Sequence, residues 1–104
     1  MDENNYMIHF EMIAAAGQSR SNSMEAIREA REGNFDAANE FLKEANENLT
    51  QAHKLGFDML QEEANGNSVE INIVAIHAQD HLTMATIMHD LAEEMIKVYQ
   101  RLEK

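Results

Sequence analysis

The absence of proline from all 104 residues is the feature that most restricts how this chain can fold. Proline interrupts helices, and glycine, which also weakens them, occurs only four times. The chain is rich in alanine, glutamate, methionine and leucine, all of which favour helices. These properties predict an all-α protein, and the length fits a single domain over residues 1–104.

Two breaks divide the helical sequence. The first covers residues 32–36, where Gly33 suits the position after a helix end and Asn34 or Asp36 can cap the next helix. The second covers residues 65–68 and is rich in asparagine and glycine. The breaks separate three long segments: residues 6–31, residues 35–64 and a segment that ends near residue 104. Long helices joined by short connections predict an antiparallel, up-down-up bundle.

The start of the third helix has more than one possible position, between Ser68 and Gln79. Asn67 and Glu70 have the spacing of a capping pair, which would begin the helix early. Residues 69–73 alternate apolar and polar side chains, as an extended segment does, which would begin it late. His77 is then either near the helix N-terminus or two turns inside the helix.

The net charge of −11 limits the classes of partner. No cluster of lysine or arginine exists to neutralise phosphates, so nucleic acid and an anionic membrane surface are disfavoured. An acidic surface suits solubility or a basic protein partner. Cysteine is absent, which excludes disulfides and thiolate metal sites. With no long apolar stretch and no signal-peptide pattern, the expected location is the cytoplasm.

The apolar patterns of the second and third helices differ. The second helix carries one narrow seam of mostly small residues: Ala38, Leu42, Ala45, Leu49, Ala52, Gly56 and Met59. The third carries three rows that repeat every seven residues: Met84, Leu91 and Val98; Met88, Met95 and Leu102; and Ala78, Ala85 and Ala92. Together these rows cover about 140° of a helical wheel. That width predicts a face that serves both the subunit's own core and a neighbouring subunit, and the alternative is a wide core face in a monomer.

The run from His77 to His81 interrupts those rows. One heptad before Met84, Ile87 and Met88, the pattern has His77, Asp80 and His81 in place of apolar residues. Polar groups on such a face cost free energy unless they have partners. Because the three residues are three or four positions apart, a helix brings them close together. The run is therefore a candidate functional cluster.

Three interpretations of the cluster are open from the residues alone. His-x-x-Asp-His resembles in outline a zinc peptidase motif, with His53 or His89 as a further ligand, but a narrow bundle leaves little room for a substrate cleft. The residues could also be structural, as His9, His53 and His89 are expected to be. The favoured interpretation is that a neutral imidazole acts as a nucleophile towards phosphorus. A helix N-terminus or Arg20 would then supply positive potential.

Five stretches carry a resemblance to a known family: Ala15-Ala16-Gly17-Gln18-Ser19-Arg20-Ser21, Glu32-Gly33-Asn34-Phe35-Asp36-Ala37-Ala38, Ala52-His53, Glu63-Ala64-Asn65-Gly66 and His77-Ala78-Gln79-Asp80-His81-Leu82. On these stretches, and over nearly its whole length, the sequence resembles the enzyme IIA component of the lactose/cellobiose (chitobiose) class of the bacterial phosphoenolpyruvate-dependent sugar phosphotransferase system. The last stretch is the specific one.

The resemblance implies a homotrimer of three-helix subunits and a phosphotransferase with a phosphohistidine intermediate. His77 is then expected to accept phosphate on Nε2 from phospho-HPr and to pass it to the IIB component, for uptake of a disaccharide. Asp80 is expected to meet its symmetry mates on the threefold axis around a structural Mg²⁺ ion, because three carboxylates repel one another. Gln79, His81 and Arg20 are candidates for orienting the site.

The sequence also departs from the family pattern. Gly56-Phe57 occupies the place where the family usually has Gln-Thr, and Thr83-Met84 reverses the usual Met-Thr. Ala78, where lactose-type proteins tend to have glycine, favours the cellobiose/chitobiose branch. The identity of the sugar stays open. The alternative function is a non-catalytic helical regulatory or interaction protein that has lost transfer.

Overall fold

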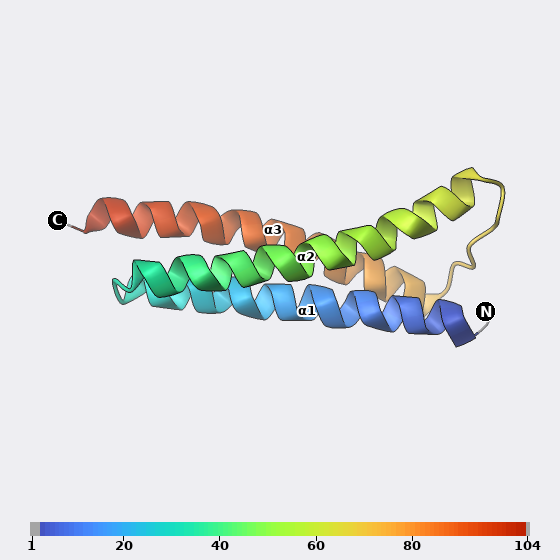
Figure 1. Cartoon of the computed structure of the whole chain (residues 1–104), viewed down its shortest axis with the longest axis horizontal. Helices are drawn as coiled ribbons and strands as arrows, with labels where there is room; N and C mark the ends of the chain where they lie inside the picture. Colours follow the sequence, from blue (N-terminus) through green and yellow to red (C-terminus); the bar gives the residue numbers. More distant parts are fainter. Residues whose placement is uncertain (1–2, 104) are drawn as a thin grey trace.

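Three helices form one elongated bundle in the computed structural model, which describes residues 3–103. Helix α1 covers Glu3–Arg31, α2 covers Phe35–Ala64 and α3 covers Ile73–Leu102. Figure 1 shows α2 running antiparallel to α1 and α3, which run in the same direction. The predicted all-α, up-down-up architecture is confirmed. Within the described residues, no helix combines the length and the apolar character needed to cross a membrane.

The turn between α1 and α2 has the local structure predicted from Gly33. Gly33 adopts a left-handed conformation with φ of 84°. Its N–H donates to the carbonyl of Ala30 at 3.0 Å, and the N–H of Asn34 donates to the carbonyl of Glu29 at 2.9 Å. This pair of bonds satisfies the last carbonyls of α1. The side chain of Asn34 donates to Glu29 at 3.0 Å instead of capping α2. Gly66, with φ of 89°, ends α2 in the same way.

Helix α3 begins at Ile73, between the two positions that the sequence allowed. Asn72 is its cap: the backbone is extended, and the side-chain oxygen accepts the N–H of Ala75 at 2.9 Å. The helix does not begin at Asn67, and residues 67–72 lie outside any helix or strand. The β-branched alternation of this segment therefore indicated the local structure better than the capping pair did.

The core lies where small residues bring the three helices close together. The predicted α2 seam is buried at Ala38, Ala45, Leu49, Ala52 and Gly56. In the half of the bundle that carries the His77 run, the core is built around buried side chains from all three helices, chiefly Met12, Ala16, Leu49, Ala52, Ala78 and Leu82. Alanine and glycine at such positions let backbones approach closely, which fixes the relative height of α1, α2 and α3.

Helix α3 is apolar on two sides. The alanine row (Ala78, Ala85, Ala92) is fully buried in the core. A second row on the other side of the helix is between 48% and 84% exposed, and we call it the exposed α3 row: Ile73, Ile76, Met84, Ile87, Leu91, Val98 and Leu102. Successive members are three, four, seven or eight residues apart, so the row follows one side of the helix. A long exposed apolar row of this kind is typical of an interaction surface.

Candidate functional site

His77 and His81 form a pair on the surface of α3. Their Nε2 atoms are 3.0 Å apart, and their rings meet edge to face with centroids 4.3 Å apart. One Nε2 therefore carries a proton and donates it to the lone pair of the other. When His81 is the donor, His77 holds its own proton on Nδ1 and presents Nε2 as an electron pair. That tautomer of His77 is the nucleophilic one.

The position of His77 in α3 determines how much positive potential the helix N-terminus provides at its ring. His77 is the fifth residue of the helix, about 7 Å along the axis from the cap. The amides of Ala75 and Ile76 already bond to Asn72, the former through its side chain and the latter through its carbonyl. The helix N-terminus thus contributes positive potential near His77, but neither of these amides donates a hydrogen bond to its ring.

Asp80 and Gln79 lie apart from the histidine pair. Both line a cavity that also includes His9 of α1, and Gln79 approaches Gly56 of α2. Asp80 falls within the exposed α3 row and makes no hydrogen bond or ion pair among residues 3–103. Sequence spacing had placed His77, Asp80 and His81 together, but only the two histidines are in contact. Side chains three residues apart need not point towards one another.

Arg20 does not lie beside His77. Side chains of Met12 and Leu82 both approach Gly56, so these residues of α1 and α3 are at the same height. Arg20 is eight residues beyond Met12, and His77 is five residues before Leu82, which separates them by about 20 Å along parallel helices. Helix α1 does run alongside α3, but its register rules out the predicted contact within one chain.

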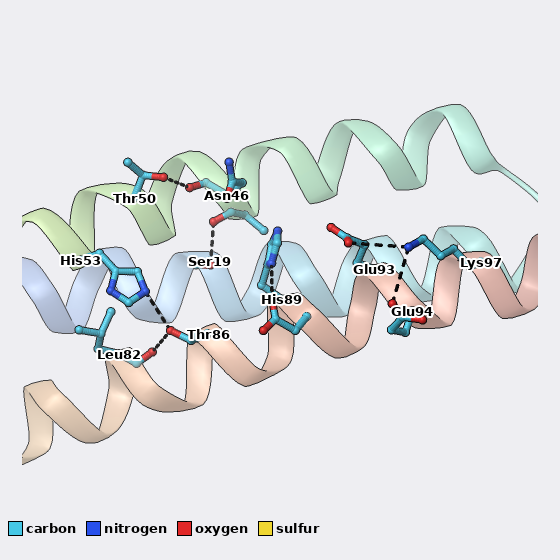
Figure 2. Close-up of polar contacts among 12 residues, drawn as sticks. Ser19, Asn46, Thr50, His53, Leu82, Thr86, His89, Glu93, Glu94 and Lys97 are labelled. Atoms are coloured by element: carbon cyan, nitrogen blue, oxygen red, sulfur yellow. Dashed lines mark hydrogen bonds and ion pairs between the residues drawn. The ribbon is translucent and has the colours of Figure 1, made fainter.

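His53 and His89 make separate contacts (Figure 2). His53 Nε2 lies 3.1 Å from Thr86 Oγ1, and this hydroxyl donates at 2.8 Å to the carbonyl of Leu82. The hydroxyl proton is thereby used, so His53 donates from Nε2 and links α2 to α3. His89 pairs with the adjacent Asp90 at 3.2 Å. Among the described residues, no three His, Asp or Glu side chains are grouped so that they could hold a metal ion.

His9 is the residue whose environment the sequence did not indicate. It was expected to be packed or on the surface, and it is 1% exposed. Both ring nitrogens are buried without a hydrogen-bond partner in the described part of the chain. Burial lowers the pKa of His9 below its ordinary value, because a charged imidazole loses hydration there. The only sequence signal was a histidine in register with the buried Met12, and that spacing does not distinguish a paired ring from an unpaired one.

The fold and the histidine pair define a class: a three-helix bundle with a pair of imidazoles on its surface near the start of its last helix. The family model described as the lactose/cellobiose-specific IIA subunit of the phosphotransferase system matches residues 7–100. The chain therefore belongs to this family of IIA components.

Individual relatives agree with that assignment. The lactose-specific EIIA component of Staphylococcus epidermidis is 37% identical over 95 residues, which are 91% of each chain. The lichenan-specific phosphotransferase enzyme IIA component of Bacillus subtilis is 37% identical over 102 residues, which are 98% of this chain and 93% of the relative. The crystal structure of the cellobiose-specific enzyme IIA from Bacillus anthracis matches with a TM-score of 0.95 and 38% identity over 99% of this chain and 94% of that one.

Proposed function

We propose that this protein carries phosphate in a sugar phosphotransferase system and that His77 is the residue phosphorylated. The observation that carries the proposal is the exposed pair of His77 and His81, whose Nε2 atoms lie 3.0 Å apart, in a chain of this family. An exposed imidazole can reach a phosphoryl group on a partner, and a neighbouring imidazole can orient and assist it. The protein would act as a phosphotransferase through a phosphohistidine intermediate.

The transfer has two balanced steps. The hydrogen bond from His81 to His77 Nε2 breaks, and the freed lone pair attacks the phosphorus carried by phospho-HPr. An N–P bond forms, and the donor atom leaves with the electron pair of the bond that breaks. The proton of His77 stays on Nδ1, so none has to be removed before attack. A nucleophile of the IIB component then attacks the same phosphorus, and His77 leaves as a neutral imidazole.

His81 has a role in both steps. Before transfer its Nε2–H donates to His77 Nε2, which keeps that nitrogen unprotonated. Once phosphorus occupies His77 Nε2, the N–H of His81 is free to donate to a phosphoryl oxygen. Hydrogen bonds to charged oxygens are stronger than those between neutral groups, so this contact would favour the phosphorylated state.

A related complex supports HPr as the donor. The solution structure of the chitobiose-specific IIA with HPr from Escherichia coli matches this chain with a TM-score of 0.85 and 25% identity over 99% of this chain and 100% of that one. The net charge of −11 suits a partner that docks through a basic surface. Relatives named for lactose, lichenan and cellobiose support a disaccharide of cellobiose/chitobiose or lactose type as the transported sugar.

We further propose that three copies assemble through the exposed α3 row. The row runs the length of a 30-residue helix and contains seven large apolar side chains. Packing three such helices around a common axis would remove these side chains from water, which favours association. An apolar row that follows the whole length of one helix can pack against the same row on two neighbouring copies, and these copies are the proposed partners.

Asp80 fits a structural Mg²⁺ site in that trimer. It lies within the row, so threefold packing would bring three Asp80 carboxylates towards the axis. Three close carboxylates repel one another, and a divalent cation removes that repulsion. Oxygen ligands are those that Mg²⁺ prefers, and water would complete its octahedral shell. The role of the ion would be assembly, and phosphate transfer would remain with His77, which lies one heptad before Met84 of the row.

The test is phosphate uptake by the purified protein from phosphoenolpyruvate, enzyme I and HPr. We expect acid-labile phosphate on the parent protein and only background on His77→Ala. His89→Ala is the matched control, because His89 is also on α3 but pairs with Asp90, and it should be phosphorylated normally. Uptake by His77→Ala equal to the parent would refute the proposal. HPr binding without any uptake would favour the non-catalytic interaction protein instead.

A further inference from the structure

A cavity with a volume of about 350 Å³ lies beside the start of α3 and is not used by the proposed transfer. In Figure 1 the C-terminal end of α2 turns away from the other helices, and the loop that follows crosses back to α3. The cavity lies between these segments, with α1 on its inner side. Its walls are mostly apolar: Met59, Leu60, Val69, Ile71, Ala75 and Ile76. A volume of this size matches that of small-molecule sites in proteins.

His9 gives the cavity a polar group that has no partner. The side chain is 1% exposed, and neither Nδ1 nor Nε2 has a hydrogen-bond partner in the described part of the chain. A buried polar group without a partner costs free energy. Because burial disfavours the charged form of His9, its pKa is lowered and the ring is neutral near pH 7. A neutral ring offers one N–H donor and one nitrogen acceptor.

Gly56 lines the cavity from α2, and we call this side its floor. A Cβ atom at Gly56 would come 3.2 Å from Leu82 Cδ2 and 3.4 Å from Met12 Cε, so even alanine would have to displace flexible side-chain ends. The backbone of Gly56 is ordinary helix, so its conformation does not require glycine. Glycine in the middle of a helix weakens it, and the missing side chain lets Met12 and Leu82 pack closely against α2 beside the cavity.

The charges and the apolar walls of the cavity indicate which chemical class of ligand it can bind. Glu63 and Asp80 both line it, and the whole chain has a net charge of −11. Negative charge at the rim disfavours anions, including phosphorylated sugars. The apolar walls disfavour a ligand that is polar on all sides, such as a free sugar. A hydroxyl group can both donate and accept, and so can meet either nitrogen of a neutral His9.

We propose that this His9 cavity binds a small uncharged molecule with an apolar body and one hydroxyl group, and that the hydroxyl pairs with His9. The site does not depend on the proposed phosphate transfer. Ile76 and Asp80 border the cavity and also belong to the face that three copies would share, so assembly would cover its mouth. The experiment therefore uses the full chain in its assembled state.

The probe is 4-methylphenol, added to protein labelled with ¹⁵N in the backbone and histidine rings. We expect saturable shifts of the His9 ring and Gly56 amide signals with a Kd of about 1 mM or below. Toluene, which lacks the hydroxyl, should bind about tenfold more weakly, because His9 then stays unpaired. The anion 4-methylbenzoate should leave these signals unchanged.

Two variants locate the site. Gly56→Leu fills the floor and should weaken 4-methylphenol binding at least about tenfold. His9→Phe keeps a ring of similar size and should abolish the preference for 4-methylphenol over toluene. Gly17→Leu is the matched control: Gly17 is also inside a helix, a Cβ there would meet nothing within 4 Å, and binding should be unchanged. Circular dichroism checks that each variant keeps its helix content.

Two results would overturn the proposal. One is the absence of saturable shifts in the parent protein, which would mean that the cavity holds only water or side chains of a neighbouring copy. The other is binding of 4-methylphenol that survives Gly56→Leu with unchanged affinity. The comparison of the three probes on the parent protein remains decisive even if a variant fails to fold.

Discussion

At the scale of single residues, the two histidines of α3 have distinct places in the account. In the proposed transfer, His77 supplies the nucleophilic Nε2, and His81, whose Nε2 lies 3.0 Å away, controls the protonation of that atom. Their proximity could be predicted from the spacing of four along a helix. Which nitrogen faces which could not, because it depends on the rotamers of both rings. Spacing also suggested a contact between Asp80 and the two histidines, and the structure shows that Asp80 instead lines the cavity of His9.

Replacing His81 tests its assisting role. We predict that His81→Ala is still phosphorylated to completion, but that the rate of uptake falls by about tenfold to a hundredfold, as on loss of one hydrogen bond to transferring oxygens. The measurement is the time course of uptake from a fixed concentration of phospho-HPr. A rate equal to that of the parent, with His89→Ala as control, would show that His81 plays no part.

His9 predicts a pH dependence of stability. Its pKa is lowered in the folded protein by burial, so below the ordinary value of about 6.5 the unfolded chain binds a proton that the folded chain does not. The free energy of unfolding should therefore be unaffected by His9 at higher pH and fall as the pH drops through that value. One proton limits the slope to about 1.4 kcal/mol per pH unit.

Denaturant unfolding of the parent and His9→Phe between about pH 7.5 and 5.5 measures this effect. Glu63 and Asp80 line the same cavity and would favour a charged His9, so the observed slope reports the balance, which burial dominates. The free energy of unfolding of the parent should fall relative to that of His9→Phe as the pH drops. A difference that is constant with pH would contradict the burial of a neutral ring.

At the scale of the elements, local chemistry made most boundaries predictable. Gly33 fixed the end of α1 because its left-handed backbone closes the final turn. The start of α2 followed from it, and the break at residues 65–68 predicted the end of α2. The start of α3 was ambiguous because the Asn67 and Glu70 pair predicted an early start and the alternation of residues 69–73 a late one. The register between α1 and α3 could not be predicted from local sequence, because it arises from the packing of Met12 and Leu82 around Gly56.

The contribution of the Asn72 cap to the free energy of unfolding should be measurable. Asn72→Ala removes the acceptor for the Ala75 N–H, and we expect a loss of about 1 kcal/mol in the free energy of unfolding. Ser68→Ala, in the exposed loop before α3, is the control and should change stability by less than about 0.5 kcal/mol. Equal effects from both changes would mean that Asn72 does not hold the first turn beneath His77.

At the scale of the whole molecule, the two apolar sides of α3 explain why the predicted face was so wide. Its alanine row fills the core of the chain, and the exposed α3 row lies on the surface of a bundle that measures 56 × 21 × 18 Å. Heptad counting predicted the alanine row and the part of the exposed α3 row that contains Met84, Leu91 and Val98. It could not assign each to core or surface, because that depends on where α1 and α2 pack.

The proposed trimer makes a prediction about Asp80. Asp80→Leu removes carboxylate repulsion from the row and should keep or strengthen the trimer, while abolishing any loss of stability on Mg²⁺ removal with a chelator. Asp90→Leu changes another exposed aspartate of α3 outside the row and should alter neither property. Sedimentation velocity measures both. Dissociation of Asp80→Leu into monomers would contradict the axial position of Asp80.

The most direct measurement of the central claim is the location of the phosphate itself. The protein is labelled with ¹⁵N in its five histidine rings and phosphorylated through enzyme I and HPr, and ³¹P–¹⁵N coupling identifies the bonded nitrogen. The account predicts one phosphate per chain, on Nε2 of His77, with His9, His53, His81 and His89 unmodified. Phosphate on another ring, or no phosphate in an otherwise active donor system, would contradict it.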